Sequence, residues 1–306
     1  MGSIPTRPTA AIAFTHKEFR VFDQDPTVRS RELGRTLANA ARNNGFTGRQ
    51  VAHKLGWDAS RVSRLLSGKR GVKQVDLAAF LAVCDVVGPP RDAALELARD
   101  ARELTWLQLH GERLPVRLTT LSNVERTAST IVCVATAMVP ALLQTKSYRR
   151  AALQAQPVIP TEEIEDRVAA GLDRQWIFDR NPPVRFLFFL HEHALTRTGP
   201  GRQIMSEQIH DLLRMSVRPH LRIRIVPERL LAHEPFELLE FDEYNPVVYV
   251  EHLNSVAFLE REETVACYHR IVTGLDEAAL DIEASRAWLT TSAAHFAHPT
   301  DDPDLP

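Results

Sequence analysis

The sequence has few cysteines, few lysines and no long hydrophobic run. Three cysteines occur in 306 residues, and none has a partner at the spacing of a metal or redox motif. Each of them, Cys84, Cys133 and Cys267, lies in an apolar periodic segment, so we predict three buried, reduced thiols. Disulfides are therefore not expected, and a hydrophobic content of 44% is enough for a sizeable core without them.

Segments typical of membrane insertion or export are also missing. The longest apolar stretch, Ile131–Leu143, is interrupted by Thr136 and Pro140 and is too short to cross a bilayer. The first residues lack the basic start and apolar core of a signal peptide. We therefore expect a cytoplasmic protein.

Basic residues are concentrated in one segment. The chain has 37 Lys or Arg, of which five are Lys, and 39 Asp or Glu, which gives a net charge of −2. Between Arg29 and Lys73, eleven basic residues occur with two acids, Glu32 and Asp58, so this segment carries +9 and the remainder −11. Such a segment favours a polyanionic partner, and charge alone leaves a solvated basic surface as the alternative.

Apolar periodicity predicts a cluster of short helices in the first third of the chain. Thr47 and Asp58 are candidate N-caps of the second and third helices, and Gly56 permits a sharp turn between them. A fourth helix follows Gly71. Residues 91–109 fit a further helix that connects to the rest of the chain.

Beyond residue 118, helical segments alternate with short apolar runs of strand type. This mixture predicts a domain of helices and strands. The aromatic side chains of Trp176, Phe178 and Phe186 are expected in its core. The predicted strands are Ile131–Val134, Val184–Leu190, Leu221–Val226, Phe236–Phe241, Val247–Glu251 and Val256–Leu259. The predicted helices are 147–155, 161–178, 202–216, 262–274 and 281–294.

The most informative stretch is Thr47–Arg70, which reads TGRQVAHKLGWDASRVSRLLSGKR. A helix-turn-helix needs a small residue in its first helix, a tight turn and an apolar lock in its second helix, and Ala52, Gly56 and Val62 fall at these places. The outward face of the second helix then fits the major groove of duplex DNA. We predict DNA contacts by Thr47, Arg49, Gln50, Ser60, Arg61, Ser63, Arg64, Lys69 and Arg70.

This stretch resembles the helix-turn-helix domains of phage-repressor and XRE type, including the V-S-R element at Val62–Arg64 and the G-K-R element at Gly68–Arg70. The resemblance implies an all-α, lambda-repressor-like domain that binds double-stranded DNA, with location at the nucleoid. It also implies a homodimer on a pseudo-palindromic operator, because one recognition helix covers only about half a site.

The second part of the chain resembles the C-terminal domain DUF5753 of actinobacterial XRE regulators, a set that includes WhiJ-like proteins. The resemblance rests on five elements in order along the chain. It implies a domain that receives a signal from a small molecule or a small partner protein. The elements are VPALLQTKSY (Val139–Tyr148), EDRVAAGLDRQ (Glu165–Gln175), HEHAL (His191–Leu195), AHEPFELLEF (Ala232–Phe241) and VVYVEHL (Val247–Leu253).

Three residues of this second domain match recurring family positions: Glu192, His233 and Glu251. They are candidates for a ligand pocket at strand ends, and Gln144 is a fourth candidate. The alternative is that Glu192, His233 and Glu251 cap helices and form structural ion pairs, and that Gln144 caps the helix after it.

His191 and His193 raise the question of a metal. Alternate residues of a strand share a face, so the two imidazoles are able to bind one ion. No further ligands appear at motif spacing, and a hydrogen-bonded histidine pair is the alternative that we favour. We expect no metal and no other cofactor.

Catalytic motifs are missing: the sequence has no nucleophile elbow, phosphate loop, Gly-rich dinucleotide turn or zinc-protease helix. We therefore expect a DNA-binding transcriptional regulator and not an enzyme. The alternative is an antitoxin-like, partner-binding module whose DNA binding is autoregulatory. An enzyme fused to a DNA-binding domain is a third hypothesis.

The expected fold class is α+β in two domains. The predicted boundaries are a flexible arm at 1–27, the helix-turn-helix domain at 28–90, a linker helix at 91–117, a DUF5753-like regulatory domain at 118–295 and a disordered tail at 296–306.

Overall fold

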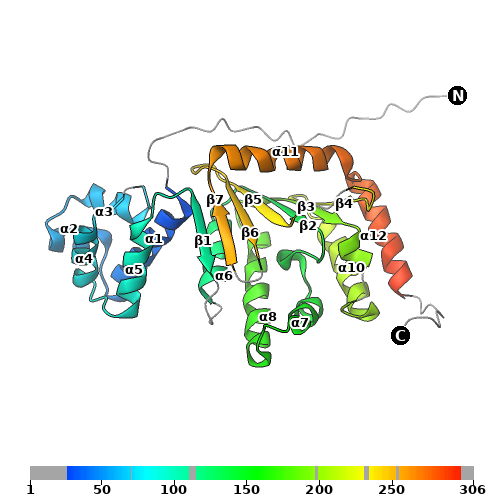
Figure 1. Cartoon of the computed structure of the whole chain (residues 1–306), viewed down its shortest axis with the longest axis horizontal. Coiled ribbons are helices and arrows are strands. Elements are labelled where there is room, and N and C mark those ends of the chain that lie inside the picture. Colours follow the sequence, from blue (N-terminus) through cyan, green and yellow to red (C-terminus); the bar gives the residue numbers. More distant parts are fainter. Residues whose placement is uncertain are drawn as a thin grey trace.

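The structure is a computed structural model that describes residues 26–69, 71–109, 115–196, 199–230, 234–252 and 255–297. Within these ranges the chain forms a helical bundle followed by a larger domain built on a seven-stranded sheet (Figure 1). The predicted α+β fold class is confirmed. The predicted arm at 1–27, apart from its last two residues, and nearly all of the predicted tail lie outside the described residues. No helix in the described part of the chain is both long and apolar enough to cross a membrane.

The helical bundle comprises the first five helices. Thr47 and Asp58 cap α2 and α3 through their side-chain oxygens, as predicted. Leu37, Val51 and Phe80 are fully buried in the bundle core. The helices are α1 (Val28–Asn43), α2 (Gly48–Leu55), α3 (Ala59–Leu66), α4 (Gln74–Val83) and α5 (Pro89–Arg99).

A glycine sets the close approach of α1 to the end of α3. A Cβ atom at Gly34 would lie 2.4 Å from the backbone oxygen of Leu66. Because that neighbour is backbone, it cannot move aside without shifting α3. The α1–α3 packing therefore depends on the missing side chain.

The larger domain is a mixed sheet with the strand order β1-β7-β6-β5-β2-β3-β4. Strands β2, β3 and β4 are parallel, and the remaining pairs are antiparallel. All six strands predicted from the sequence are present within one residue or two of their predicted bounds. The strands are β1 (Thr105–Leu109), β2 (Thr130–Ala135), β3 (Arg185–His191), β4 (Leu221–Val226), β5 (Phe236–Glu240), β6 (Val247–Glu251) and β7 (Ser255–Leu259).

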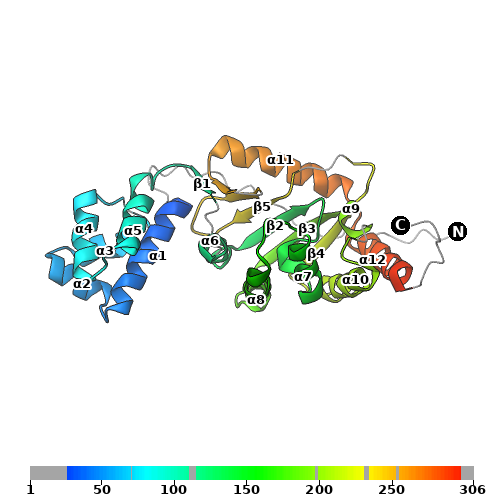
Figure 2. The same cartoon turned by 60° about the horizontal axis from the view of Figure 1, so that its bottom comes forward.

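Helices cover both faces of the sheet (Figures 1 and 2). Helix α11 packs on one face, over a core that includes Val134, Phe189 and Leu238. The other helices of the domain cover the opposite face, whose core includes Phe186 and Phe258. The elements are α6 (Pro115–Glu125), η1 (Ala141–Leu143), α7 (Lys146–Gln154), η2 (Thr161–Glu163), α8 (Ile164–Asp173), η3 (Arg174–Asp179), α9 (His193–Thr196), α10 (Arg202–Ser216), α11 (Glu262–Ala278) and α12 (Ile282–Ala297).

The predicted linker helix at 91–117 is wrong. Helix α5 ends at Arg99 and packs into the bundle, where Ala94 is fully buried. Strand β1 begins at Thr105 and pairs with β7. Trp106 is buried and Leu107 is exposed, which is the two-residue alternation of a strand. The sequence of so short an apolar segment fits a helix as well as a strand, so periodicity alone did not decide between them.

One of the three cysteines departs from expectation. Cys84 and Cys133 are buried, but Cys267 is exposed on α11. Burial raises the pKa of the Cys133 thiol well above its usual value. The apolar segment around Cys267 is amphipathic, and Val265 takes the buried position two residues before it.

The two domains meet at the first turns of α1. Both carboxylate oxygens of Glu260, which follows β7, accept from the backbone N–H of Val28 at 3.0 and 3.1 Å. The Arg31 guanidinium lies over the rings of Phe241 and Tyr244, 4.8 and 4.5 Å from their centroids. Burial raises the pKa of Glu260 to about 7, and the Arg31 charge opposes that shift. The larger domain therefore caps the helix on which the bundle is built.

A second set of contacts joins the domains one helical turn further along. Arg35 Nη1 donates to the side-chain oxygen of Asn123 on α6 at 2.6 Å. The side-chain amide of Asn123 in turn donates to Glu32 at 3.3 Å. Helix α6 thus contacts α1 through directional side-chain bonds.

We predict that Glu260→Gln changes the pH dependence of unfolding. A carboxyl whose pKa is higher in the folded than in the unfolded chain stabilises the fold fully below its unfolded pKa and loses that contribution as pH rises through about 7. Between pH 4.5 and 8 the native protein should lose about 3 kcal/mol more than Glu260→Gln, measured by urea unfolding at each pH. Parallel pH profiles of the two proteins would contradict this assignment.

Candidate functional site

Local backbone and side-chain features fix both ends of α2. Thr47 Oγ1 accepts from the backbone N–H of Gln50 at 3.3 Å, and Gln50 Oε1 accepts from the Thr47 N–H at 2.8 Å. Gly56 ends α2 in the left-handed region with φ of 65°. Thr47 and Gln50 are exposed, but their side chains are used by this capping box in the unbound protein.

Helix α3 presents a polar face to solvent. Val62 and Leu65 are buried, whereas Ser60, Ser63 and Arg64 are exposed. Arg64 donates from Nε to the backbone oxygen of Ser60 and from Nη2 to Ser60 Oγ, both at 3.3 Å. Ser60 and Arg64 therefore share one face of α3.

The Arg61 side chain packs against the surface of the bundle and does not project freely into solvent. Its Nη2 lies 2.6 Å from Asp76 Oδ2, and its guanidinium carbon lies 4.0 Å from the centroid of the Trp57 ring. The ion pair and the stacked ring fix the α3 helix against α4. A DNA contact by Arg61 would require this pair to open, which the sequence did not indicate.

The other predicted DNA contacts flank α3. Arg49 on α2 and Lys69 after α3 are both exposed. Arg70 lies outside the described residues. Five predicted DNA contacts are therefore exposed and take no part in the capping box of α2: Arg49, Ser60, Ser63, Arg64 and Lys69.

The positive charge of residues 29–73 is divided between two surfaces. Arg29 is buried and donates to the backbone oxygens of Glu96 and Leu97. Arg31 and Arg35 contact the larger domain, as described above. Some arginines of the +9 segment thus form contacts within the molecule. The hypothesis that the whole positive charge of this segment serves a polyanionic partner is wrong.

In the larger domain, Gln144 has a structural position. Its side-chain nitrogen donates to the backbone oxygen of Val139 at 2.8 Å, and its oxygen accepts from Arg149 at 3.4 Å. Gln144 is buried, and its own backbone oxygen accepts from Gln175 at 2.9 Å. These bonds fix the η1 segment.

The structure does not bring the predicted acidic pair together. Glu192 follows β3 and accepts from the backbone N–H of Glu228 at 3.0 Å. Glu251 ends β6 and accepts from the hydroxyl of Tyr249 at 3.3 Å. Strands β5 and β2 lie between β6 and β3, which separates the two positions by roughly 14 Å across the sheet. His233 lies outside the described residues.

A buried charged cluster lies on the face of the sheet opposite α11. The sequence did not reveal it. Arg174 donates to both oxygens of Glu125 at 3.1 and 2.6 Å, and both side chains are almost fully buried. Arg174 Nη2 also lies 3.7 Å from Glu237. Burial and the neighbouring Glu125 raise the pKa of Glu237 to about 8. Burial acts to lower the pKa of Arg174, but the Glu125 carboxylate outweighs it and the net shift is upward.

The sequence contained only part of the signal for this cluster. Arg174 falls in the EDRVAAGLDRQ element, and Glu237 alternates with the buried residues Phe236 and Leu238. An acid on the same strand face as Leu239 was detectable from the two-residue period. Its partner on η3 was not, because the pairing depends on tertiary packing.

The two histidines after β3 do not form a metal pair. His191 ends β3 and His193 starts α9, so they do not share the face of one strand. His191 Nδ1 accepts from the His193 N–H at 3.2 Å, and its Nε2 lies 3.3 Å from the Leu230 oxygen. Across the described residues, no cluster of three or more His, Cys, Asp or Glu has the arrangement of a metal site.

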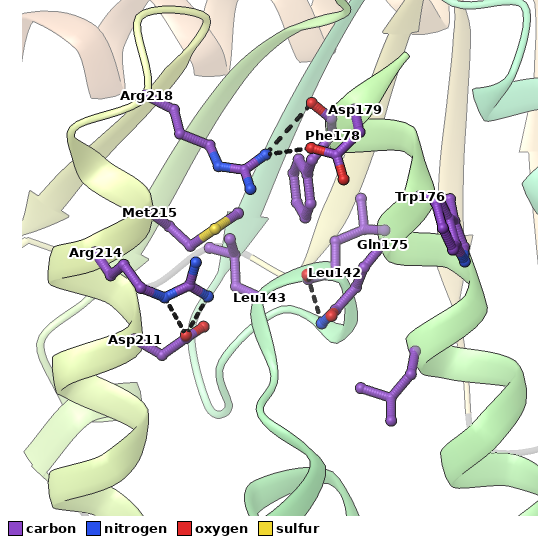
Figure 3. A pocket seen from close by; sticks show the side chains of 11 residues that line it. Leu142, Leu143, Gln175, Trp176, Phe178, Asp179, Asp211, Arg214, Met215 and Arg218 are labelled. Atoms are coloured by element: carbon purple, nitrogen blue, oxygen red, sulfur yellow. Dashed lines mark hydrogen bonds and ion pairs between the residues drawn. The ribbon is translucent and has the colours of Figure 1, made fainter.

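A cavity of about 220 Å³ opens between η1, η3 and α10 (Figure 3). Leu142, Leu143 and Met215 form its apolar floor and are buried. Trp176 lies at its rim and is 74% exposed, so the expectation that Trp176 belongs to the core is wrong. Phe178, also in its wall, is buried as predicted.

We predict that Arg174→Met destabilises the larger domain strongly. Removal of the guanidinium leaves the buried carboxyl of Glu125 without its partner, which typically costs about 3–5 kcal/mol. The matched control is Arg150→Met, because Arg150 forms a bidentate pair with the exposed Glu165. That variant should lose little stability, because solvent screens an exposed ion pair. Equal losses in chemical denaturation would show that the buried pair has no special role.

Comparison with known proteins agrees with these two units. Residues 32–94 match a family described as a helix-turn-helix domain, and residues 118–291 match the family described as a domain of unknown function, DUF5753. No curated protein matches the chain. Among solved structures, the chain is similar to the archaeal chromatin protein TrmBL2, described as showing a novel mode of DNA binding, with 14% identity and a TM-score of 0.28. That match covers 72% of this chain and 65%, less than two thirds, of the other.

The DUF5753 match spans more than half of the chain, from α6 to α12 of the sheet domain. The helix-turn-helix match covers the bundle and supports DNA binding by it. The chain therefore belongs to the DUF5753 family and carries a helix-turn-helix domain before the family's domain.

Proposed function

We propose that this protein is a sequence-specific transcriptional regulator that reads duplex DNA with α3. The observation that supports the proposal most is the exposed polar face of α3, formed by Ser60, Ser63 and Arg64 on a helix whose other face is locked in the bundle core. A single α-helix fits the major groove, and an arginine there pairs with guanine or phosphate.

The position of α3 relative to the larger domain supports this proposal. Hydrogen bonds and ring contacts between the two units, as far as the described residues show, run through Thr27, Val28, Arg29, Arg31, Glu32 and Arg35. All six lie in or directly before α1. Figures 1 and 2 place α2, α3 and α4 on the side of α1 away from the sheet, so a duplex is able to approach α3.

The proposal includes a homodimer. One α3 helix covers about half of an operator, and a two-fold pair places half-sites one helical turn, about 34–36 Å, apart. A pseudo-palindromic operator follows from that symmetry.

For the larger domain we propose reception of a signal and not catalysis, in the manner of the actinobacterial, WhiJ-like regulators that its sequence resembles. The side chains of Arg174 and Glu237, whose pKa values are both shifted upward, are only 5% and 12% exposed, so a substrate would not reach them readily. A small molecule or a partner protein is the proposed input.

We predict that Arg64→Ala weakens operator binding by about 1–3 kcal/mol, because it removes a charged contact to a base or phosphate. The operator is first selected from genomic fragments with the purified chain, and affinity is then measured by mobility shift. The matched control is Arg91→Ala on α5, whose guanidinium lies beside Asp92 and away from α3. It should bind within twofold of the native protein.

Salt dependence separates the possible outcomes. If Arg64 contacts a phosphate, the slope of log affinity against log salt falls by about one in the variant; if it reads a base, the slope stays and specificity relaxes. Native affinity in Arg64→Ala, or the same loss in Arg91→Ala, would rule out α3 as the reading helix.

A further inference from the structure

The cavity between η1, η3 and α10 has the composition of a small-molecule site. Its floor is apolar, and its volume is about 220 Å³. Its walls carry polar groups as well, among them the Gln175 amide, which donates to the Leu142 backbone oxygen, and two arginine–aspartate pairs (Figure 3). Binding sites for metabolites commonly combine such a floor with a few charged groups that fix orientation.

The exposed indole of Trp176 is the first indication of an occupant. It is 74% exposed, although its neighbours Ile177 and Phe178 on η3 are buried. A large aromatic side chain in water at the mouth of an apolar cavity is available to stack on a flat or apolar molecule.

Two arginines on the opposite wall supply the charge. Arg214 donates from Nε to Asp211 at 3.1 Å, and Arg218 donates from Nη1 to Asp179 at 3.0 Å. Figure 3 shows the Arg214 guanidinium, from α10, near Leu143 and the Arg218 guanidinium, from the turn after α10, near Phe178. Each guanidinium has five N–H donors, so these bonds leave donors that are able to bind an anion.

The aspartates do not prevent an anion from binding. In each pair one side chain is well exposed, Arg214 at 64% and Asp179 at 62%, and its partner is 25% or 30% exposed. Exposed ion pairs of this kind contribute little to stability, so a carboxylate is able to share or displace them at small cost.

The cavity wall is continuous with the contact to the helix-turn-helix domain. Arg174, the first residue of η3, is held by Glu125 on α6. Two residues earlier on α6, Asn123 bonds to Arg35 and Glu32 of α1. A displacement of η3 by an occupant therefore acts on α1 through one buried ion pair and one short helix.

We propose that this cavity binds a small molecule with an apolar or aromatic body and one carboxylate, and that its occupancy is transmitted to α1 through Arg174–Glu125 and Asn123. The second half of the proposal rests on the regulatory function proposed above. The carboxylate contacts Arg214 and Arg218, and the apolar body lies between the leucine floor and Trp176.

The binding test uses 3-phenylpropanoate as the probe and the neutral 3-phenylpropanamide as its matched control, with the full chain and titration calorimetry. The acid should bind saturably, and the amide at least tenfold more weakly. Arg214→Gln and Arg218→Gln should each weaken the acid at least tenfold. Arg99→Gln is the control variant, because Arg99 forms an exposed i,i+3 pair with Glu96 like that of Arg214 with Asp211.

Location is checked with Trp176→Phe, which should remove most of the fluorescence change that the acid produces. The binding proposal is overturned if the acid shows no saturable binding up to millimolar concentration, if the amide binds as tightly, or if Arg214→Gln and Arg218→Gln bind the acid like the native protein. None of these measurements involves DNA, so they are independent of the proposed function.

Transmission is measured by hydrogen exchange of the α1 amides with and without the acid. Exchange at α1 should change at least threefold in the native protein and less than 1.5-fold in Arg35→Gln, which should bind the acid normally. An unchanged α1, or an equal change in Arg35→Gln, overturns the transmission. Operator affinity is then compared with and without the acid, and failure to bind any operator would count against the proposed function alone.

Discussion

Helix α1 belongs to two hydrophobic cores, and the organisation of the molecule depends on this. Leu33 and Leu37 are buried in the helical bundle, whereas Val28 is buried with the core of the sheet domain. Glu260 accepts from the first free N–H of the same helix and so satisfies a donor that helix geometry leaves unpaired. The DNA-binding unit is therefore not attached by a flexible linker alone. Its first helix is held by the other domain.

This arrangement explains the uneven use of arginine in the basic segment. Arg31 is half-buried at the junction, and this burial lowers the pKa of its guanidinium. Its Nε and Nη2 atoms have no hydrogen-bond partner, and the charge is compensated by the Phe241 and Tyr244 rings and by nearby Glu260. A partly satisfied polar contact of this kind is sensitive to small shifts, which is what the proposed transmission through α1 requires.

Much of the fold was predictable because local patterns and tertiary packing agree. The six predicted strands are rich in apolar residues, either as buried runs or in alternation with polar ones as in β4, and the caps at Thr47 and Asp58 follow from side-chain chemistry alone. Strand β1 was not predictable in this way. Its residues alternate around Trp106, but only pairing with β7 decides that the segment is extended.

The candidate sites were predictable to different degrees. Exposure of Ser60, Ser63 and Arg64 follows from helix periodicity, whereas the engagement of Arg61 by Asp76 depends on the fold of α4 against α3. In the sheet domain, recurring residues such as Gln144 and Glu192 have structural bonds. Residues that form the buried cluster and the cavity come from segments far apart in the chain, and single-sequence patterns do not reveal such neighbours.

The central claim is that α3 lies in the major groove, and site-specific photo-crosslinking tests it most directly. A photoreactive residue at Ser63, exposed on α3, is compared with one at Val87, exposed at the turn between α4 and α5. The account predicts crosslinks from position 63 to bases at two symmetric stretches of the operator, and none from position 87. Crosslinks from position 87 but not from position 63 would contradict it.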